Sequence, residues 1–160
     1  MKTSKSTNEA SKPTDLSNLL PLIERVKEAL CGELAEYGEM LALLEEERDS
    51  VATGCVRDVV RSAEALDQQQ LVIRSVRHER AMCQSKLAGA LGRPADASFN
   101  DLIPLLPQPH QLPVTTLVRE INDILGRVQN SFRQNHSLLN QSLDKLQSLI
   151  QMMQAPQQAV

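Results

Sequence analysis

Apolar residues recur every three or four positions over three long stretches of this chain, which is the spacing of one face of an α-helix. The stretches cover residues 18–50, 56–91 and 113–154. Gly54 separates the first two, and Gly92 with Pro94 ends the second, so these two helices should form an antiparallel hairpin. The pattern therefore predicts an all-α fold: an elongated hairpin joined by a third long C-terminal helix, as a three-helix bundle or coiled coil.

The segment 92–112, which precedes the third helix, is rich in proline and should act as a connector. Its prolines, together with Pro113, should prevent a continuous helix. Ser98 and Asp101 have the spacing of a capping box, which predicts one short helical turn over 99–103. We expect the apolar side chains of this segment to cover one end of the hairpin: Phe99, Leu102, Ile103, Leu105 and Leu106.

The two ends of the chain lack this periodicity. Residues 1–17 are polar and rich in Lys and Ser, which predicts a disordered leader, and residues 155–160 should form a frayed tail. A single helical domain over 18–154 remains.

The third predicted helix has an unusual polar surface. Its apolar stripe is flanked by many Asn and Gln side chains and few charges. Such a surface suits a helix that pairs with another helix and then releases it, because desolvating charges would cost too much. Gly126 could be a soft point that leaves the rest of the helix free to change partner; the favoured alternative is a plain glycine in a continuous helix. The stripe is Leu117, Ile121, Ile124, Val128, Phe132, Asn135, Leu139, Leu143, Leu146, Ile150 and Met153.

Charge and composition narrow the function. A net charge of −3 argues against nucleic-acid binding, and only 2% of the residues are aromatic, which is typical of elongated helical bundles. No apolar run is long enough to insert in a membrane, and no signal peptide is visible, so we expect a cytoplasmic protein. The first helix is net acidic and the second net basic, which favours their pairing. The acidic run 45–47 should be a solvated helix end.

Candidate chemistry is absent. The three cysteines, Cys31, Cys55 and Cys83, are widely spaced, and the histidines lie in different predicted elements. No phosphate-binding or nucleophile motif occurs. We therefore predict no enzyme activity, no metal site and no cofactor.

Three segments share a pattern with a known family: LALLEEERDSVATGCVRDV at the end of the first helix, LAGALGRP at the end of the second, and SFRQNHSLLNQSLDKLQSLIQMM in the third. They resemble the FlgN-type flagellar export chaperones. The last segment is the most specific, since it carries the N-x-x-L-L-x-Q-S-L pattern of that family. The residues at its defined positions are Asn135, Leu138, Leu139, Gln141, Ser142 and Leu143.

The resemblance implies a cytosolic chaperone that binds the amphipathic C-terminal segments of hook-associated junction proteins, keeps them unassembled, and has the export gate as a further partner. The chaperone itself would be a monomer or weak homodimer. The alternative is a self-assembling structural coiled coil without a client. The client-binding residues implied on the third helix are Val128, Phe132, Asn135, Leu138, Leu139, Gln141, Ser142, Leu143, Leu146, Leu149, Ile150 and Met153.

Overall fold

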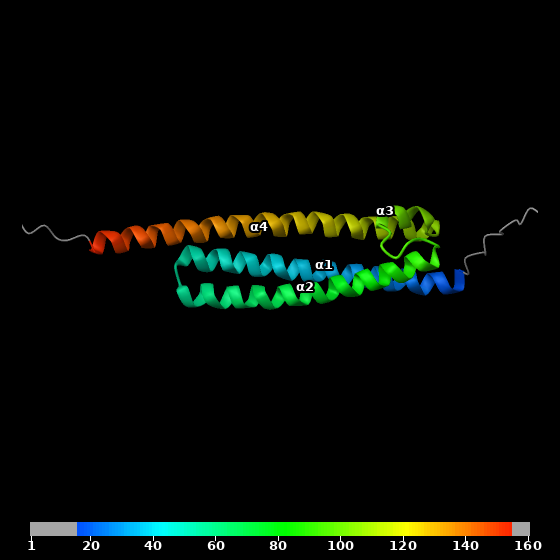
Figure 1. Cartoon of the computed structure of the whole chain (residues 1–160), viewed down its shortest axis with the longest axis horizontal. Helices are drawn as coiled ribbons and strands as arrows, with labels where there is room; N and C mark the ends of the chain where they lie inside the picture. Colours follow the sequence, from blue (N-terminus) through cyan, green and yellow to red (C-terminus); the bar gives the residue numbers. More distant parts are fainter. Residues whose placement is uncertain (1–15, 155–160) are drawn as a thin grey trace, which may run out of the picture.

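A computed structural model describes residues 16–154 and contains three long helices that lie side by side (Figure 1). The elements are α1 (Leu16–Thr53), α2 (Val56–Ala90), α3 (Phe99–Leu102), the 3-10 helix η1 (Ile103–Leu105) and α4 (Gln108–Gln154). No strand occurs in the described range. The predicted all-α hairpin with a third long helix is confirmed.

The predicted ends of the domain are only partly covered. Residues 1–15 and 155–160 lie outside the described residues. Residues 16 and 17, which we assigned to the leader, already belong to α1. Leu19 is buried only one turn further on, and this early burial explains why the helix begins before residue 18.

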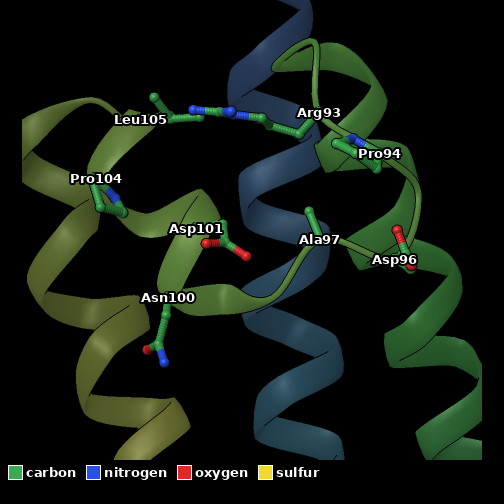
Figure 2. A pocket seen from close by; sticks show the side chains of 8 residues that line it. All are labelled: Arg93, Pro94, Asp96, Ala97, Asn100, Asp101, Pro104 and Leu105. Carbon is green, nitrogen blue, oxygen red and sulfur yellow. The ribbon is translucent and has the colours of Figure 1, made fainter.

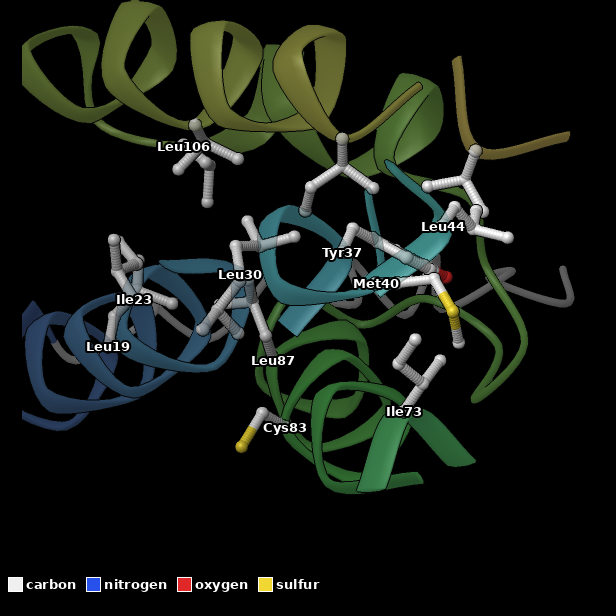
Figure 3. Close-up of a cluster of buried hydrophobic side chains, with 14 of the residues drawn as sticks. Leu19, Ile23, Leu30, Tyr37, Met40, Leu44, Ile73, Cys83, Leu87 and Leu106 are labelled. Atoms are coloured by element: carbon white, nitrogen blue, oxygen red, sulfur yellow. The ribbon is translucent and has the colours of Figure 1, made fainter. Parts of the chain in front are cut away.

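Helix α1 lies between α2 and α4 and packs against both (Figure 1). It runs antiparallel to α2 and in the same direction as α4. Residues such as Ile23, Leu30 and Leu44 of α1 are fully buried, and Leu87 of α2 meets them in the same core (Figure 3). Since α1 is covered on two sides, half-buried residues such as Leu22, Leu34 and Leu41 flank its buried stripe.

The two predicted glycine turns are confirmed. Gly54 has φ of 70° and reverses the chain between α1 and α2. Gly92 has φ of 67° and ends α2 in a Schellman arrangement: the Arg93 amide donates to the Ala88 carbonyl (2.8 Å) and the Gly92 amide to the Gly89 carbonyl (3.1 Å). Glycine suits both positions because it has no Cβ to oppose a positive φ.

The connector contains the predicted capping box. The Ser98 hydroxyl accepts from the Asp101 amide (3.3 Å), and the Asp101 carboxylate accepts from the Ser98 amide (3.2 Å). Leu102 and Leu106 are buried and Phe99 and Ile103 half-buried, as expected of residues that cover the hairpin. Leu105 is 40% exposed, so its predicted packing is wrong; only one side of this short turn faces the hairpin.

The predicted start of the last helix at 113 is wrong, since α4 begins at Gln108. Pro109 lies in the first turn, where a backbone N–H has no helical acceptor, so the missing donor costs nothing. Pro113 removes one internal hydrogen bond. The Gln111 side chain donates to the Leu106 carbonyl (2.9 Å) and ties this first turn to the connector.

Candidate functional site

The first part of α4 is held on α1 by residues that recur every seven positions. Val114, Ile121, Val128 and Asn135 are the buried residues of this helix. Val118, Leu125 and Phe132, four positions after the first three, are partly buried against the same core. A strict seven-residue repeat keeps one face of a helix on its partner, as in coiled coils. We call this surface the docking face of α4.

Asn135 ends the docking face with a polar contact to α1. Its side-chain amide donates to the Leu44 carbonyl and to a carboxylate oxygen of Glu47, both at 2.8 Å. Asn135 is 1% exposed and Glu47 7% exposed, so both groups are inside the protein. The acidic run 45–47 is therefore not fully solvated, which corrects that prediction for Glu47. Glu47 is buried because its side chain points toward α4, where it meets Asn135.

The carbonyl oxygen Oδ1 of Asn135 is buried and has no hydrogen-bond partner among the described residues. A lone buried amide oxygen costs about 1–3 kcal/mol. The two hydrogen bonds of the amide nitrogen offset part of this cost. A buried Asn in a helix interface fixes the register of the two helices at some expense in stability. Asn135 thus sets how far α4 advances along α1.

Beyond this contact α4 extends past the end of the hairpin formed by α1 and α2. Every residue from 143 to 154 is exposed, and Figure 1 shows this stretch projecting past the turn between α1 and α2. We call residues 143–154 the overhang. At about 1.5 Å per residue it is about 18 Å long. Five apolar side chains with half or more of their surface exposed form a stripe along it: Leu143, Leu146, Leu149, Ile150 and Met153.

A short segment, residues 136–142, separates the docking face from the overhang, and we call it the transition. Leu138, Leu139 and Ser142 are half-buried. A hollow of about 360 Å³ beside Leu138 is lined by Arg48, Gln134 and Ser137, and Arg48 donates to Gln134 across it (3.0 Å). The contact between α4 and α1 therefore decreases over the transition.

The candidate residues named from the sequence fall into four groups. Val128, Phe132 and Asn135 face α1. Leu138, Leu139 and Ser142 lie in the transition, and the five apolar candidates that form the stripe lie on the overhang. Gln141 is exposed, donates to the Ser137 hydroxyl (3.4 Å), and by helical spacing lies on the side away from Leu146. Sequence reasoning missed Glu47, Arg48 and Gln134, which no motif marks.

Gly126 does not interrupt α4, which is one helix from Gln108 to Gln154. A Cβ added at Gly126 would meet nothing within 4 Å, so no neighbouring backbone requires a glycine there. The division between held and free parts of α4 lies instead at the transition, where α1 ends.

A second hollow lies in the connector, at the other end of the molecule from the overhang (Figures 1 and 2). Its volume is about 620 Å³. Hydrogen bonds from Ser98 lower the pKa of the Asp101 carboxyl, so this acid is already engaged in the capping box. Figure 2 shows the lining residues: Arg93, Pro94, Asp96, Ala97, Asn100, Asp101, Pro104 and Leu105. It is a surface hollow with both polar and apolar lining residues, remote from the overhang.

Within residues 16–154, no three His, Cys, Asp or Glu side chains gather in a way that could hold a metal ion. No helix in that range is long and apolar enough to cross a membrane. The cysteines are unpaired: Cys31 and Cys55 are exposed and Cys83 is buried.

Fold and site together define an elongated α-helical protein that presents one amphipathic helix beyond the end of its own bundle. The FlgN protein family model matches residues 20–159, and the chain belongs to the FlgN family. This family consists of chaperones that act in flagellum biogenesis, so the family resemblance seen in the sequence is confirmed. Neither the comparison with curated proteins nor that with solved structures gives a match.

Proposed function

We propose that this protein is a cytosolic export chaperone for flagellar hook-associated junction proteins. The overhang of α4 binds the amphipathic C-terminal segment of the client, keeps it from assembling, and allows its delivery to the flagellar type III export apparatus. The observation that carries the proposal is the apolar stripe from Leu143 to Met153, which no other described element covers.

The physical reason is complementarity between two amphipathic helices. A client segment that will pack into a filament exposes an apolar stripe beforehand and tends to aggregate. A second apolar stripe buries it as a helix in a groove or along a helix. Charged residues on the overhang are few, namely Asp144 and Lys145, so little charge has to be desolvated when the two surfaces meet.

A matched pair of substitutions tests the proposal. Leu146 on the overhang and Leu71 on α2 are each 54% exposed, so Leu146→Ser and Leu71→Ser remove the same side chain from the same degree of exposure. We expect Leu146→Ser to weaken binding of a junction protein's C-terminal peptide by about tenfold, which is about 1.4 kcal/mol. Leu71→Ser should change it less than twofold.

Fluorescence anisotropy with a labelled peptide gives both affinities. Circular dichroism checks that each variant keeps its helix content. Equal losses of affinity for the two leucine variants would contradict the proposal. So would a failure of the peptide to bind the unaltered chain.

The alternative of a self-assembling coiled coil makes the opposite prediction for the free protein. It requires a stable oligomer at low micromolar concentration that added client leaves intact. Our proposal expects a monomer or weak homodimer that client converts to a heterodimer. Sedimentation velocity with and without the peptide separates the two.

A further inference from the structure

We propose that the client helix lies end to end with α1, on the continuation of the docking face of α4, with one end against the turn between α1 and α2. The inference rests on the proposed function and adds to it which side of the overhang is used and where the bound helix stops. Its basis is the continuity of the stripe on the overhang with the interface that α4 already makes with α1.

The seven-residue repeat of the docking face does not stop where α1 stops. The buried series Val114, Ile121, Val128, Asn135 continues with Ser142 and Leu149. The neighbouring series Val118, Leu125, Phe132 continues with Leu139, Leu146 and Met153. Leu143 and Ile150, next to these series, widen the stripe. The overhang therefore presents to solvent the same side of α4 that α1 covers further back.

The end of α1 is what uncovers this side. Helices α1 and α4 run in the same direction, and their last polar contacts join Leu44 and Glu47 to Asn135 and Arg48 to Gln134. Helix α1 then ends at Thr53, and Gly54 turns the chain back into α2. A helix that covered the stripe next would occupy the place that a longer α1 would have taken.

We do not expect the client helix to lie in line with α2. Helix α4 packs on α1 and forms no comparable interface with α2. The stripe on the overhang thus continues the α1 side of the bundle. A client in line with α2 would leave Leu146 and Leu149 largely uncovered.

The occupant is a single amphipathic helix of limited length. The overhang spans 12 residues, from 143 to 154, so a client helix of about three to four turns covers it at about 1.5 Å per residue. Sliding further toward the connector would require displacing α1 and breaking the hydrogen bonds of Asn135 to Leu44 and Glu47. The end of α1, which the contact at Asn135 helps to hold on α4, therefore sets the limit of the bound helix.

The native cysteines allow a direct test in the full chain. Cys55 lies in the turn where the client helix should end, whereas Cys31 lies far back on α1, and both are exposed. A photoreactive group on a short tether is attached to Cys55 in Cys31→Ser protein, and to Cys31 in Cys55→Ser protein; Cys83 is buried and stays unchanged. The probe is the same junction-protein peptide.

We expect the group at Cys55 to capture the peptide at least about fivefold more efficiently than the group at Cys31. Binding at normal affinity with equal capture from the two positions would overturn the placement and leave the proposed function standing. Capture of a second copy of this chain in place of the peptide would also overturn it. Failure of the peptide to bind the unlabelled chain would overturn both proposals.

A second pair of variants tests the side of the helix. Leu146→Lys places a charge on the continued docking face, and Ser148→Lys places the same charge two positions away, on the opposite side of α4. We expect more than a tenfold loss of peptide affinity for Leu146→Lys and less than a twofold change for Ser148→Lys. Equal losses, or a greater loss for Ser148→Lys, would contradict the assigned side.

Discussion

Three buried polar side chains of α1 and α4 show how individual residues set the geometry. Glu33 of α1 accepts from Arg80 of α2 at 2.7 Å and from the Tyr37 hydroxyl at 3.2 Å. Glu47 accepts from Asn135 of α4. One acid thus fixes α1 to α2, and the other fixes α1 to α4. Among the described residues, Glu33 with Arg80 is the one ion pair that joins α1 and α2, so the predicted charge attraction between these helices is concentrated at a single place.

Replacing Asn135 should loosen α4 at the end of its docking face. Asn135→Ala leaves the buried Glu47 carboxylate without its amide donor, so we expect a loss of about 1–3 kcal/mol in the free energy of unfolding. Asn130→Ala is the control: this exposed asparagine of the same helix should change the same quantity by less than about 0.5 kcal/mol. Urea denaturation followed by circular dichroism measures both. Equal, small losses would mean that the Asn135 contact does not hold the helix.

Tyr37 should make stability depend on alkaline pH. Burial, and then the negative charge of Glu33, raise the pKa of the Tyr37 hydroxyl above its ordinary value of 10.0. As pH rises past about 10, the unfolded chain loses this proton while the folded chain keeps it. The stabilising contribution is therefore fully present below that pH and is lost as pH approaches the raised pKa.

Tyr37→Phe provides the comparison. The stability of the unaltered protein minus that of the variant should fall as pH rises above about 10. The chain has one Tyr and no Trp, so tyrosinate absorbance reports Tyr37 alone and gives its pKa in the folded protein. A pKa at or below that of the unfolded chain would contradict the burial argument.

For the individual helices, the sequence predicted the features that depend on neighbouring residues in the chain: the helices themselves, their turns and their caps. The three-residue and four-residue spacing of apolar side chains located all three long helices, and Gly54, Gly92 and Ser98 with Asp101 marked their turns and caps. The start of α4 was missed because a proline in a first turn costs nothing. Which side chains of α4 are held and which are free was also beyond reach, since this depends on where α1 ends beside it.

Gly126 and Gly92 should respond in opposite ways to the same substitution. Gly126 is in the middle of α4 with open space around it, so Gly126→Ala should stabilise the protein by about 0.5–1 kcal/mol. The affinity of Gly126→Ala for the client should differ from that of the unaltered protein by less than twofold. A variant that is more stable yet binds client poorly would restore Gly126 as a functional soft point.

Gly92→Ala forces a Cβ into a positive-φ conformation at the end of α2. We expect it to destabilise the protein by about 1–2 kcal/mol. The midpoint of urea unfolding for the two alanine variants should therefore shift in opposite directions. A neutral Gly92→Ala would mean that the Schellman turn relaxes without cost.

For the whole molecule, the main feature is a difference in length between parallel neighbours. Helix α1 ends at Thr53 beside the transition of α4, and α4 continues to Gln154 (Figure 1). The core therefore holds one part of a single helix, while every residue of the overhang is exposed. Isolated helices of this length are marginally stable in water, so the overhang should open readily when no partner is bound.

Amide hydrogen exchange resolved along α4 tests this account most directly. In the free protein, amides from Leu117 to Asn135 should exchange slowly and those from Leu143 to Met153 quickly, with the change at the transition. Added junction-protein peptide should slow the second group and leave the first unchanged. Uniformly slow exchange along the helix, unaffected by the peptide, would contradict the central claim that the overhang is free to receive a client.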